Sequence, residues 1–242
     1  MDGLYLQIWA IAGTAFTMLI GFPWAIARFR DRSLRAERAR LARLLPENVS
    51  IGKGLILGTE RKWLETDGVA PGLHLRTGDA VTPTSWTEPG SGDPLFDAEV
   101  VVSGNMFMAR ALLDAPTRAA VREAMRVWGD AAEGVIRVGR YEEVDANDQA
   151  RALVALAERL RLLPDEEVLT RLVELSQGDP SPLVRALCFD AFAERGAPGS
   201  ARALARTLLT DTDPRVVVRA AGWLGDEAAD RLAAFQIGRA HV

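Results

Sequence analysis

Hydrophobic residues follow three different patterns along the 242-residue chain. Residues 4–27 contain no charged side chain over 24 positions. Residues 46–142 combine short apolar runs with Gly and Pro, which is typical of strands joined by turns. From Asn147 onward, apolar residues recur at helical spacing between short breaks that hold Pro or Gly. The pattern therefore predicts a mainly α protein with a membrane-spanning helix, a small α+β domain and a helical region, in that order.

The uncharged stretch is long enough to cross a bilayer. At 1.5 Å per residue it reaches roughly 36 Å, against a hydrocarbon core of about 30 Å. Rings that favour the membrane interface mark its ends, Tyr5 and Trp9 at one and Trp24 at the other. We predict a transmembrane helix over residues 1–27. A cleaved signal peptide and a buried core helix are the alternatives, although the first needs a basic start and the second is rarely apolar on every face.

Arginines follow the apolar stretch at once, whereas only Asp2 precedes it. Those nearest the predicted membrane surface are Arg28, Arg30, Arg32 and Arg35. By the positive-inside rule, we expect a single-pass protein of the bacterial inner membrane whose C-terminal bulk is cytoplasmic. Residues 28–45 continue as a predicted basic juxtamembrane helix that Pro46 ends. This arm either binds anionic headgroups or is an ordinary topology flank.

Residues 46–142 predict a small α+β domain. The expected strands cover residues 54–57, 62–66, 73–76, 99–102 and 134–140, and the expected helices cover residues 106–113 and 116–128. Residues 82–94, TPTSWTEPGSGDP, are expected to form a loop on composition alone.

Within this domain, GDPLFDAEVVVSG at residues 92–104 is followed by ALLDAPTRAAVREAM at residues 111–125. The combination resembles a pattern of uncharacterised bacterial membrane-anchored proteins, which implies a shared fold and no known chemistry. Asp93 and Asp97 have no His or Cys nearby. We therefore expect them to be turn and strand-cap residues, and we predict no metal site.

Residues 143–235 predict successive helices. Their expected ranges are 148–162, 164–176, 182–194, 199–209 and 214–224, with a last piece that starts at Asp226. A shift of 34 residues places Asp179-Pro180 on Asp213-Pro214 and Val184-Arg185 on Val218-Arg219. A recurring helix pair is the signature of a solenoid.

These residues resemble the HEAT repeat in its short bacterial form. DPSPLVRALCFDAFAERG at residues 179–196 and DTDPRVVVRAAGWLGD at residues 211–226 share Asp-Pro before a helix and Val-Arg near its start. The resemblance implies that Arg185 and Arg219 bond acidic or carbonyl groups of neighbouring repeats, and that Asp179 and Asp213 cap helices. It also implies a curved stack of helices that offers a broad surface to another protein.

Residues 236–242 do not continue the helical pattern. Residues 237–242 can be back-translated as ATC GGA AGA GCA CAC GTC, the start of a common short-read sequencing adapter. Our hypothesis is that the native coding sequence is represented to about Phe235 and that this chain is a fragment of a longer gene. His241 then carries no functional meaning.

Composition narrows the classes of function. The net charge is -4 although the juxtamembrane arm is strongly basic, so the remainder is acidic, which argues against nucleic acid as a partner. The single cysteine, Cys188, excludes an internal disulfide and fits a reducing compartment.

The chain contains none of the common catalytic motifs. A P-loop, a nucleophile elbow, His-Glu-x-x-His, Cys-x-x-Cys and a dinucleotide fingerprint are all missing from the sequence. His74 lies between two leucines in a strand pattern, so we expect it to be an ordinary residue of the sheet. Cys188 lies inside a predicted helix, so we expect it to be a small buried hydrophobic residue. The tryptophans are dispersed, which predicts no ring-stacking platform. We predict no enzyme activity and no cofactor.

The sequence as a whole predicts a membrane-anchored cytoplasmic scaffold or adaptor that binds an unidentified protein partner through a HEAT-like surface. Two alternatives stay open. In the first, the chain is the anchor and scaffold part of an enzyme whose catalytic domain lies in a missing C-terminal part. In the second, the α+β domain is a sensor for a small ligand and the solenoid relays its occupancy.

Overall fold

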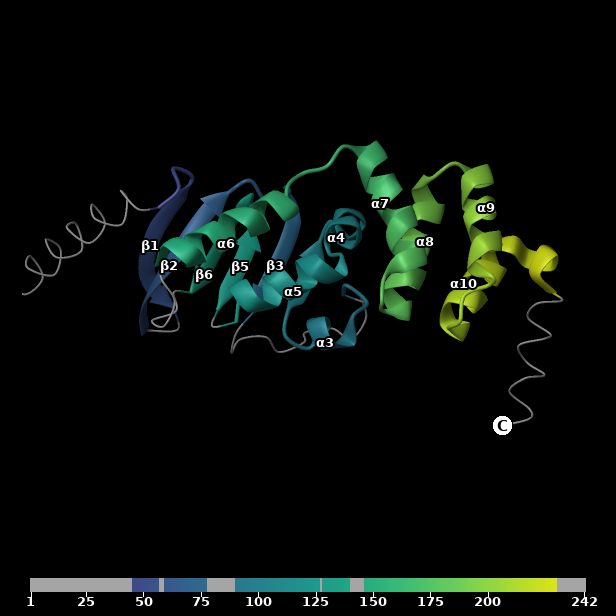
Figure 1. The fold of residues 1–242 in the computed structure, drawn as a ribbon, viewed down its shortest axis with the longest axis horizontal. Coiled ribbons are helices and arrows are strands. Elements are labelled where there is room, and N and C mark those ends of the chain that lie inside the picture. The colour runs from purple at the N-terminus through teal and green to yellow at the C-terminus, as the bar shows by residue number, and fades with distance from the viewer. Residues whose placement is uncertain (1–44, 57–58, 78–89, 127, 140–145, 230–242) are drawn as a thin grey trace, which may run out of the picture. The chain divides into compact units, whose positions relative to one another are not determined.

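The computed structural model describes residues 45–56, 59–77, 90–126, 128–139 and 146–229 (Figure 1). The elements below belong to one compact unit that begins at Asn48. No helix in the described part of the chain is long and apolar enough to span a bilayer. The predicted span lies outside the described ranges, and so do the residues predicted at the membrane interface: Tyr5, Trp9, Trp24, Arg28, Arg30, Arg32 and Arg35. The C-terminal residues 236–242 also lie outside them.

Six strands form one sheet in which every neighbouring pair is antiparallel. The strands are β1 (Val49–Ile56), β2 (Thr59–Asp67), β3 (Leu73–Thr77), β4 (Val101–Gly104), β5 (Gly129–Ala132) and β6 (Val135–Gly139). Their spatial order is β1-β2-β6-β5-β3-β4. The second half of the chain therefore inserts the β5–β6 hairpin between β2 and β3.

The described helices fall between and after these strands. They are α3 (Pro94–Asp97), α4 (Met106–Leu112), α5 (Ala115–Ala124), α6 (Ala146–Arg159), α7 (Asp165–Gly178), α8 (Pro182–Arg195), α9 (Pro198–Leu208) and α10 (Pro214–Leu224), followed by the 3-10 turn η2 (Gly225–Ala228). This part of the chain is thus a mixed fold of helices and an antiparallel sheet, as the prediction of an α+β region required.

One face of the sheet is apolar and covered by helices. Leu64, Leu75, Ile136 and Val138 alternate with partly exposed residues along their strands and are fully buried. Because successive side chains of a strand point to opposite faces, this alternation selects the face that packs. Helix α6 packs against β2, β6 and α5 on that face (Figure 1).

Helices α7–α10 form a second packing group. Helix α8 packs against α7, α9 and α10, and α9 packs against α10. Helix α4 packs against α7 and α8, although it lies far earlier in the sequence. We call α7–α10 the helical series. By its contacts α6 lies with the sheet, whereas the predicted domain boundary at residue 143 assigned it to the repeats.

The region after α5 differs from the sequence prediction. A helix was expected over residues 116–128, but α5 ends at Ala124 and β5 follows after Trp128. Glu133 and Gly134 then reverse the chain into β6, with positive φ values of 54° and 82°. Two successive positive φ values are the geometry of a tight hairpin turn, and its Glu-Gly sequence is a weak local signal. Strand β5 was missed for that reason.

Helix α3 lies at the end of the predicted loop. Asp93 accepts hydrogen bonds from the backbone N–H groups of Leu95 and Phe96, and Pro94 occupies the first helical position. A capping aspartate followed by proline is a common helix start. The next strand, expected at residues 99–102, begins at Val101 because α3 and its C-cap use the residues before it.

Candidate functional site

We call the six strands and helices α3–α6 the sheet domain. A buried arginine lies where the sheet domain meets the helical series. Arg118, the fourth residue of α5, is 3% exposed. Its guanidinium donates to both carboxylate oxygens of Asp179, each at 3.0 Å. Its Nε donates to Asp93 at 3.0 Å and its Nη1 to the carbonyl of Leu113 at 2.7 Å. One side chain thus joins three segments of the chain.

The two aspartates are themselves held by backbone groups. Asp179 accepts a further hydrogen bond from the N–H of Ser181 at 2.8 Å, and the Ser181 hydroxyl donates to the carbonyl of Gly92 at 2.9 Å. Burial opposes the charge of Arg118, but the hydrogen bonds and charges of Asp179 and Asp93 outweigh it and raise the arginine pKa. The guanidinium of Arg118 therefore stays charged although it is buried, because its charge is paired.

A second arginine, inside the helical series, repeats this arrangement. Arg185 is the fourth residue of α8 and donates to both carboxylate oxygens of Asp211, each at 2.8 Å. Its third hydrogen bond, at 2.7 Å, goes to the carbonyl of Asp179. Asp211 accepts from the N–H two residues on, that of Asp213, as Asp179 does from Ser181. We call Arg118, Asp179, Arg185 and Asp211 the arginine–aspartate ladder.

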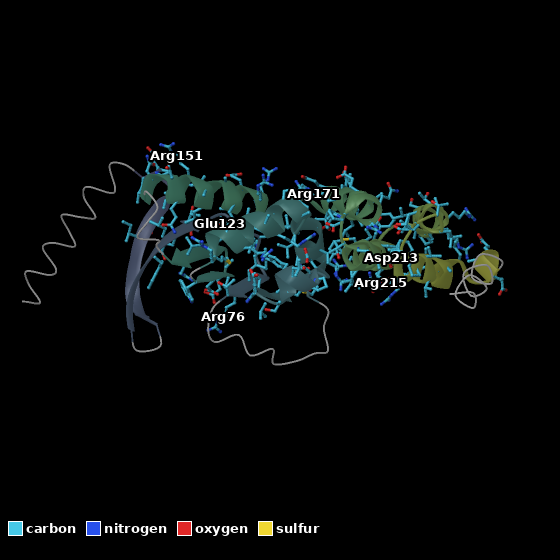
Figure 2. The ribbon with its side chains drawn as sticks, turned by 60° about the horizontal axis from the view of Figure 1, so that its bottom comes forward. Arg76, Glu123, Arg151, Arg171, Asp213 and Arg215 are labelled. Carbon is cyan, nitrogen blue, oxygen red and sulfur yellow. The ribbon has the colours of Figure 1, made fainter. Side chains whose placement is uncertain are left out.

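The structure gives the predicted repeat residues distinct positions. Asp179 binds Arg118 and does not cap α8, whose N-cap residue is Ser181. Asp213 does cap α10, through the N–H of Arg215, and also pairs with the Arg215 side chain (Figure 2). Arg185 binds Asp211, and Arg219 of α10 binds Asp190 of α8 at 2.8 Å.

The bonding pattern shifts the repeat by two residues. By the 34-residue period, the position equivalent to Asp179 is Asp213. By the bonds to arginine it is Asp211, and Asp179 and Asp211 each lie three residues before a helix. Counted from the helix start, the α10 position equivalent to Arg185 is Val217, which is fully buried. The ladder therefore ends at α10.

Helix α10 exposes two large apolar side chains, one at each edge of its solvent face. Val218 is 56% exposed and Trp223 is 43% exposed. At a spacing of three to four residues, they share this face with Arg215, Arg219 and Gly222, all of which are exposed. The Trp223 ring also meets the buried Phe189 ring of α8 edge-on, with centroids 6.2 Å apart. We call these five exposed residues of α10 the α10 surface.

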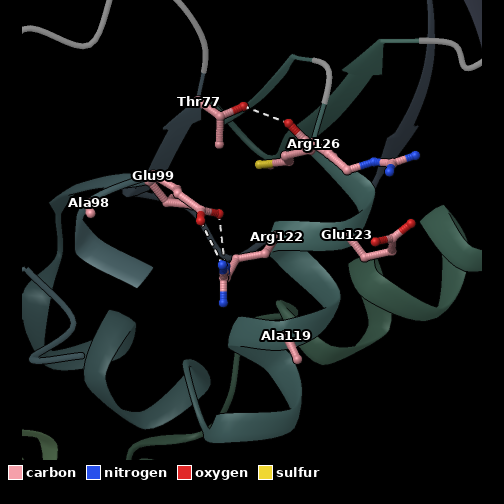
Figure 3. Close-up of a pocket in the computed structure, with 9 residues that line it drawn as sticks. Thr77, Ala98, Glu99, Ala119, Arg122, Glu123 and Arg126 are labelled. Atoms are coloured by element: carbon pink, nitrogen blue, oxygen red, sulfur yellow. Dashed lines mark hydrogen bonds and ion pairs between the residues drawn. The ribbon is translucent and has the colours of Figure 1, made fainter. Parts of the chain in front are cut away.

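A cavity of about 690 Å³ lies beside α5 in the sheet domain (Figure 3). Arg122 and Glu99 form a bidentate pair at its wall, with distances of 2.8 and 2.6 Å. The hydrogen bond from Arg122 lowers the pKa of Glu99. Glu123 and Arg126 also line the cavity, so its rim carries both charges. Its volume is in the range of small-molecule sites. We call it the α5 pocket.

The structure places Cys188, His74 and Asp97, the residues considered above for catalysis or metal binding, at three separate positions. Cys188 is fully buried, and burial, with a smaller effect of Asp179, raises the pKa of its thiol to about 12. His74 is exposed on β3. Asp97 accepts hydrogen bonds from the N–H groups of Ser91 and Gly92 within the loop before α3. Within the described ranges, no group of three or more His, Cys, Asp or Glu side chains is placed to hold a metal ion.

Two tryptophans that are 65 positions apart in sequence form a pair. The rings of Trp63 and Trp128 lie 6.2 Å apart between centroids. Gly139 pairs with Trp63 across the β2–β6 ladder and donates its N–H to the carbonyl of Trp128. The two rings are tilted by 53° to each other and are not stacked. Strand register brings the rings together, and no local pattern signals it.

Comparisons of the chain with protein-family models, with curated proteins and with solved structures found no match.

Proposed function

We propose that this chain is a membrane-anchored scaffold that binds a protein partner through a HEAT-like helical series. The α10 surface is the observation that supports it. Exposed apolar residues scattered singly need no explanation, but Val218 and Trp223 flank two arginines on the solvent face of α10. Tryptophan and arginine are the residues most enriched among those that dominate interface energies. The partner is expected to cover this face.

A crosslinking experiment in native cells tests the binding role. A photo-reactive amino acid is placed at Val218 and, as the matched control, at Leu162, which is 59% exposed between α6 and α7. We expect one partner to be captured from position 218 and not from position 162. Val218→Glu should then reduce recovery of that partner at least tenfold, whereas Leu162→Glu should not. Equal capture at both positions would refute a role for the α10 surface.

The membrane anchor is proposed from the sequence, through the uncharged residues 4–27 and the arginines that follow. The full chain is expected to stay in the membrane fraction after carbonate washing. External protease added to intact spheroplasts should leave the helical series uncut, and lysis should expose it. Cleavage before lysis would reverse the proposed orientation.

The α5 pocket favours a second candidate, a sensor for a small ligand. Arg122 in its wall lies one turn after Arg118 on α5, so an occupant would contact the helix that binds the helical series. Thermal unfolding of the full chain across a metabolite panel tests it. A ligand of the pocket should raise the melting temperature of the wild type and not that of Ala119→Trp, which fills the pocket wall. No ligand-dependent shift across the panel would count against the sensor.

A further inference from the structure

The arginine–aspartate ladder crosses from the sheet domain into the helical series. Arg118 binds Asp93, 25 residues before it, and Asp179, 61 residues after it. The side chain of Asp179 is fully buried, and the carbonyl of the same residue accepts from Arg185. Asp179 is therefore shared by the two arginines.

The pair that joins α5 to the residues before α8 and the pair that joins α8 to the residues before α10 have two features in common. They differ in the donors, because Arg118 uses Nη1 and Nη2 whereas Arg185 uses Nε and Nη2. In each, an arginine in the first turn of a helix binds both oxygens of an aspartate that lies three residues before the next helix. In each, that aspartate also accepts a backbone N–H two residues on. The same arginine–aspartate pattern thus occurs once between α5 and the start of α8 and once between α8 and the start of α10.

Apolar contacts accompany the first of these pairs. Helix α4 buries Met108, Ala109, Ala111 and Leu112 and packs against α7 and α8. Gly92 lies close against α8, since a Cβ atom there would lie 2.8 Å from Leu187 and 3.1 Å from the backbone N of Val184. A series of stacked helices needs its first apolar face covered, because each unit contacts only its neighbours.

We propose that Arg118 is a clasp that makes the sheet domain the N-terminal cap of the helical series, so that the two unfold as one cooperative unit. This does not depend on the proposed function. A bidentate arginine–carboxylate pair requires a defined distance and orientation, so the clasp fixes how α5 and α8 meet.

Native-state hydrogen exchange of the full chain in increasing urea tests the proposal. In the wild type, β6 and α8 should reach their slowest exchange through one opening with the same urea dependence. In Arg118→Met, exchange in α8 should become at least tenfold faster relative to β6. The matched control is Arg185→Met, which removes the same kind of pair inside the series. There, α10 should gain exchange relative to α8, while α8 and β6 stay coupled.

Two results would overturn the clasp. One is different urea dependence for β6 and α8 in the wild type, which needs no variant and decides the question even where Arg118→Met fails to fold. The other is an unchanged ratio of exchange rates in Arg118→Met, within threefold. Asp179→Asn, which keeps an acceptor for the N–H of Ser181, provides a milder break of the same pair. It should uncouple α8 from β6 in the same direction.

Discussion

The pair of Arg185 and Asp211 should contribute measurably to stability because it is nearly buried. The side chains are 11% and 9% exposed, and Arg185 makes three hydrogen bonds, two to Asp211 and one to the carbonyl of Asp179. Removing one partner of a fully buried pair costs about 3–5 kcal/mol, because the other charge is left unpaired. Since some water reaches this pair, we expect Arg185→Met to lower the free energy of unfolding by about 2–4 kcal/mol.

The complementary substitution should cost less. Asp211→Asn keeps an oxygen for the N–H of Asp213, and Arg185 keeps its bond to the carbonyl of Asp179. We expect a loss of about 1–2 kcal/mol. In the double variant neither charge is left unpaired, so its loss should be smaller than the sum by about 1.5–3 kcal/mol.

Equilibrium urea unfolding of the full chain measures all corners of this cycle. The control is Arg206→Met, which removes a pair of similar length, 2.8 Å, to Glu227 between side chains that are 60% and 43% exposed. Exposed pairs are screened by water, so no resolvable change is expected there. Equal effects of Arg185→Met and Arg206→Met, or a double variant whose loss equals the sum, would refute the argument.

Three further outcomes follow from single sites. Burial raises the pKa of the Cys188 thiol to about 12, so at pH 8 it should react with maleimide at least about 1000-fold more slowly in the folded chain than in guanidinium. Complete labelling of the folded chain within minutes would contradict this. Gly92→Ala should lower the free energy of unfolding by about 2–3 kcal/mol, because φ is +90° and the new Cβ meets α8. Gly68→Ala, with φ +108° and open space around it, should lower it by only about 1–2 kcal/mol through backbone strain, and equal losses in urea unfolding would contradict the close contact at Gly92. Burial opposes ionisation of Asp211, but its hydrogen bonds outweigh burial and lower its pKa. The stabilisation from its charge is therefore present above the ordinary pKa of 3.8 and is lost as the pH falls below that value. The difference in unfolding free energy between wild type and Asp211→Asn should narrow in acid, and a difference that widens would contradict the lowered pKa.

Local features of the fold were largely readable from the chain. Strand β3 covers Leu73–Thr77, against a prediction of residues 73–76, because its apolar residues alternate. Helices α8 and α10 begin at Pro182 and Pro214, as predicted, because proline suits a first helical turn. Such signals act within one or two turns and do not depend on the rest of the fold.

The partners of buried polar and aromatic groups were not readable in the same way. The resemblance to the HEAT repeat implied that Asp179 caps a helix, but the carboxylate binds Arg118, which is 61 residues away. The Trp63–Trp128 pair depends on strand register and on the insertion of β5 and β6 between β2 and β3. Neither of these is encoded in a local pattern.

The sequence by itself determined where most helices and strands lie, because capping, proline geometry and apolar spacing are local effects. Only the tertiary structure decided that α4 and α5 of the sheet domain contact the helical series and that one buried arginine joins them. A buried charge is stable only with its partners in place, and those partners come together only when segments distant in sequence have packed.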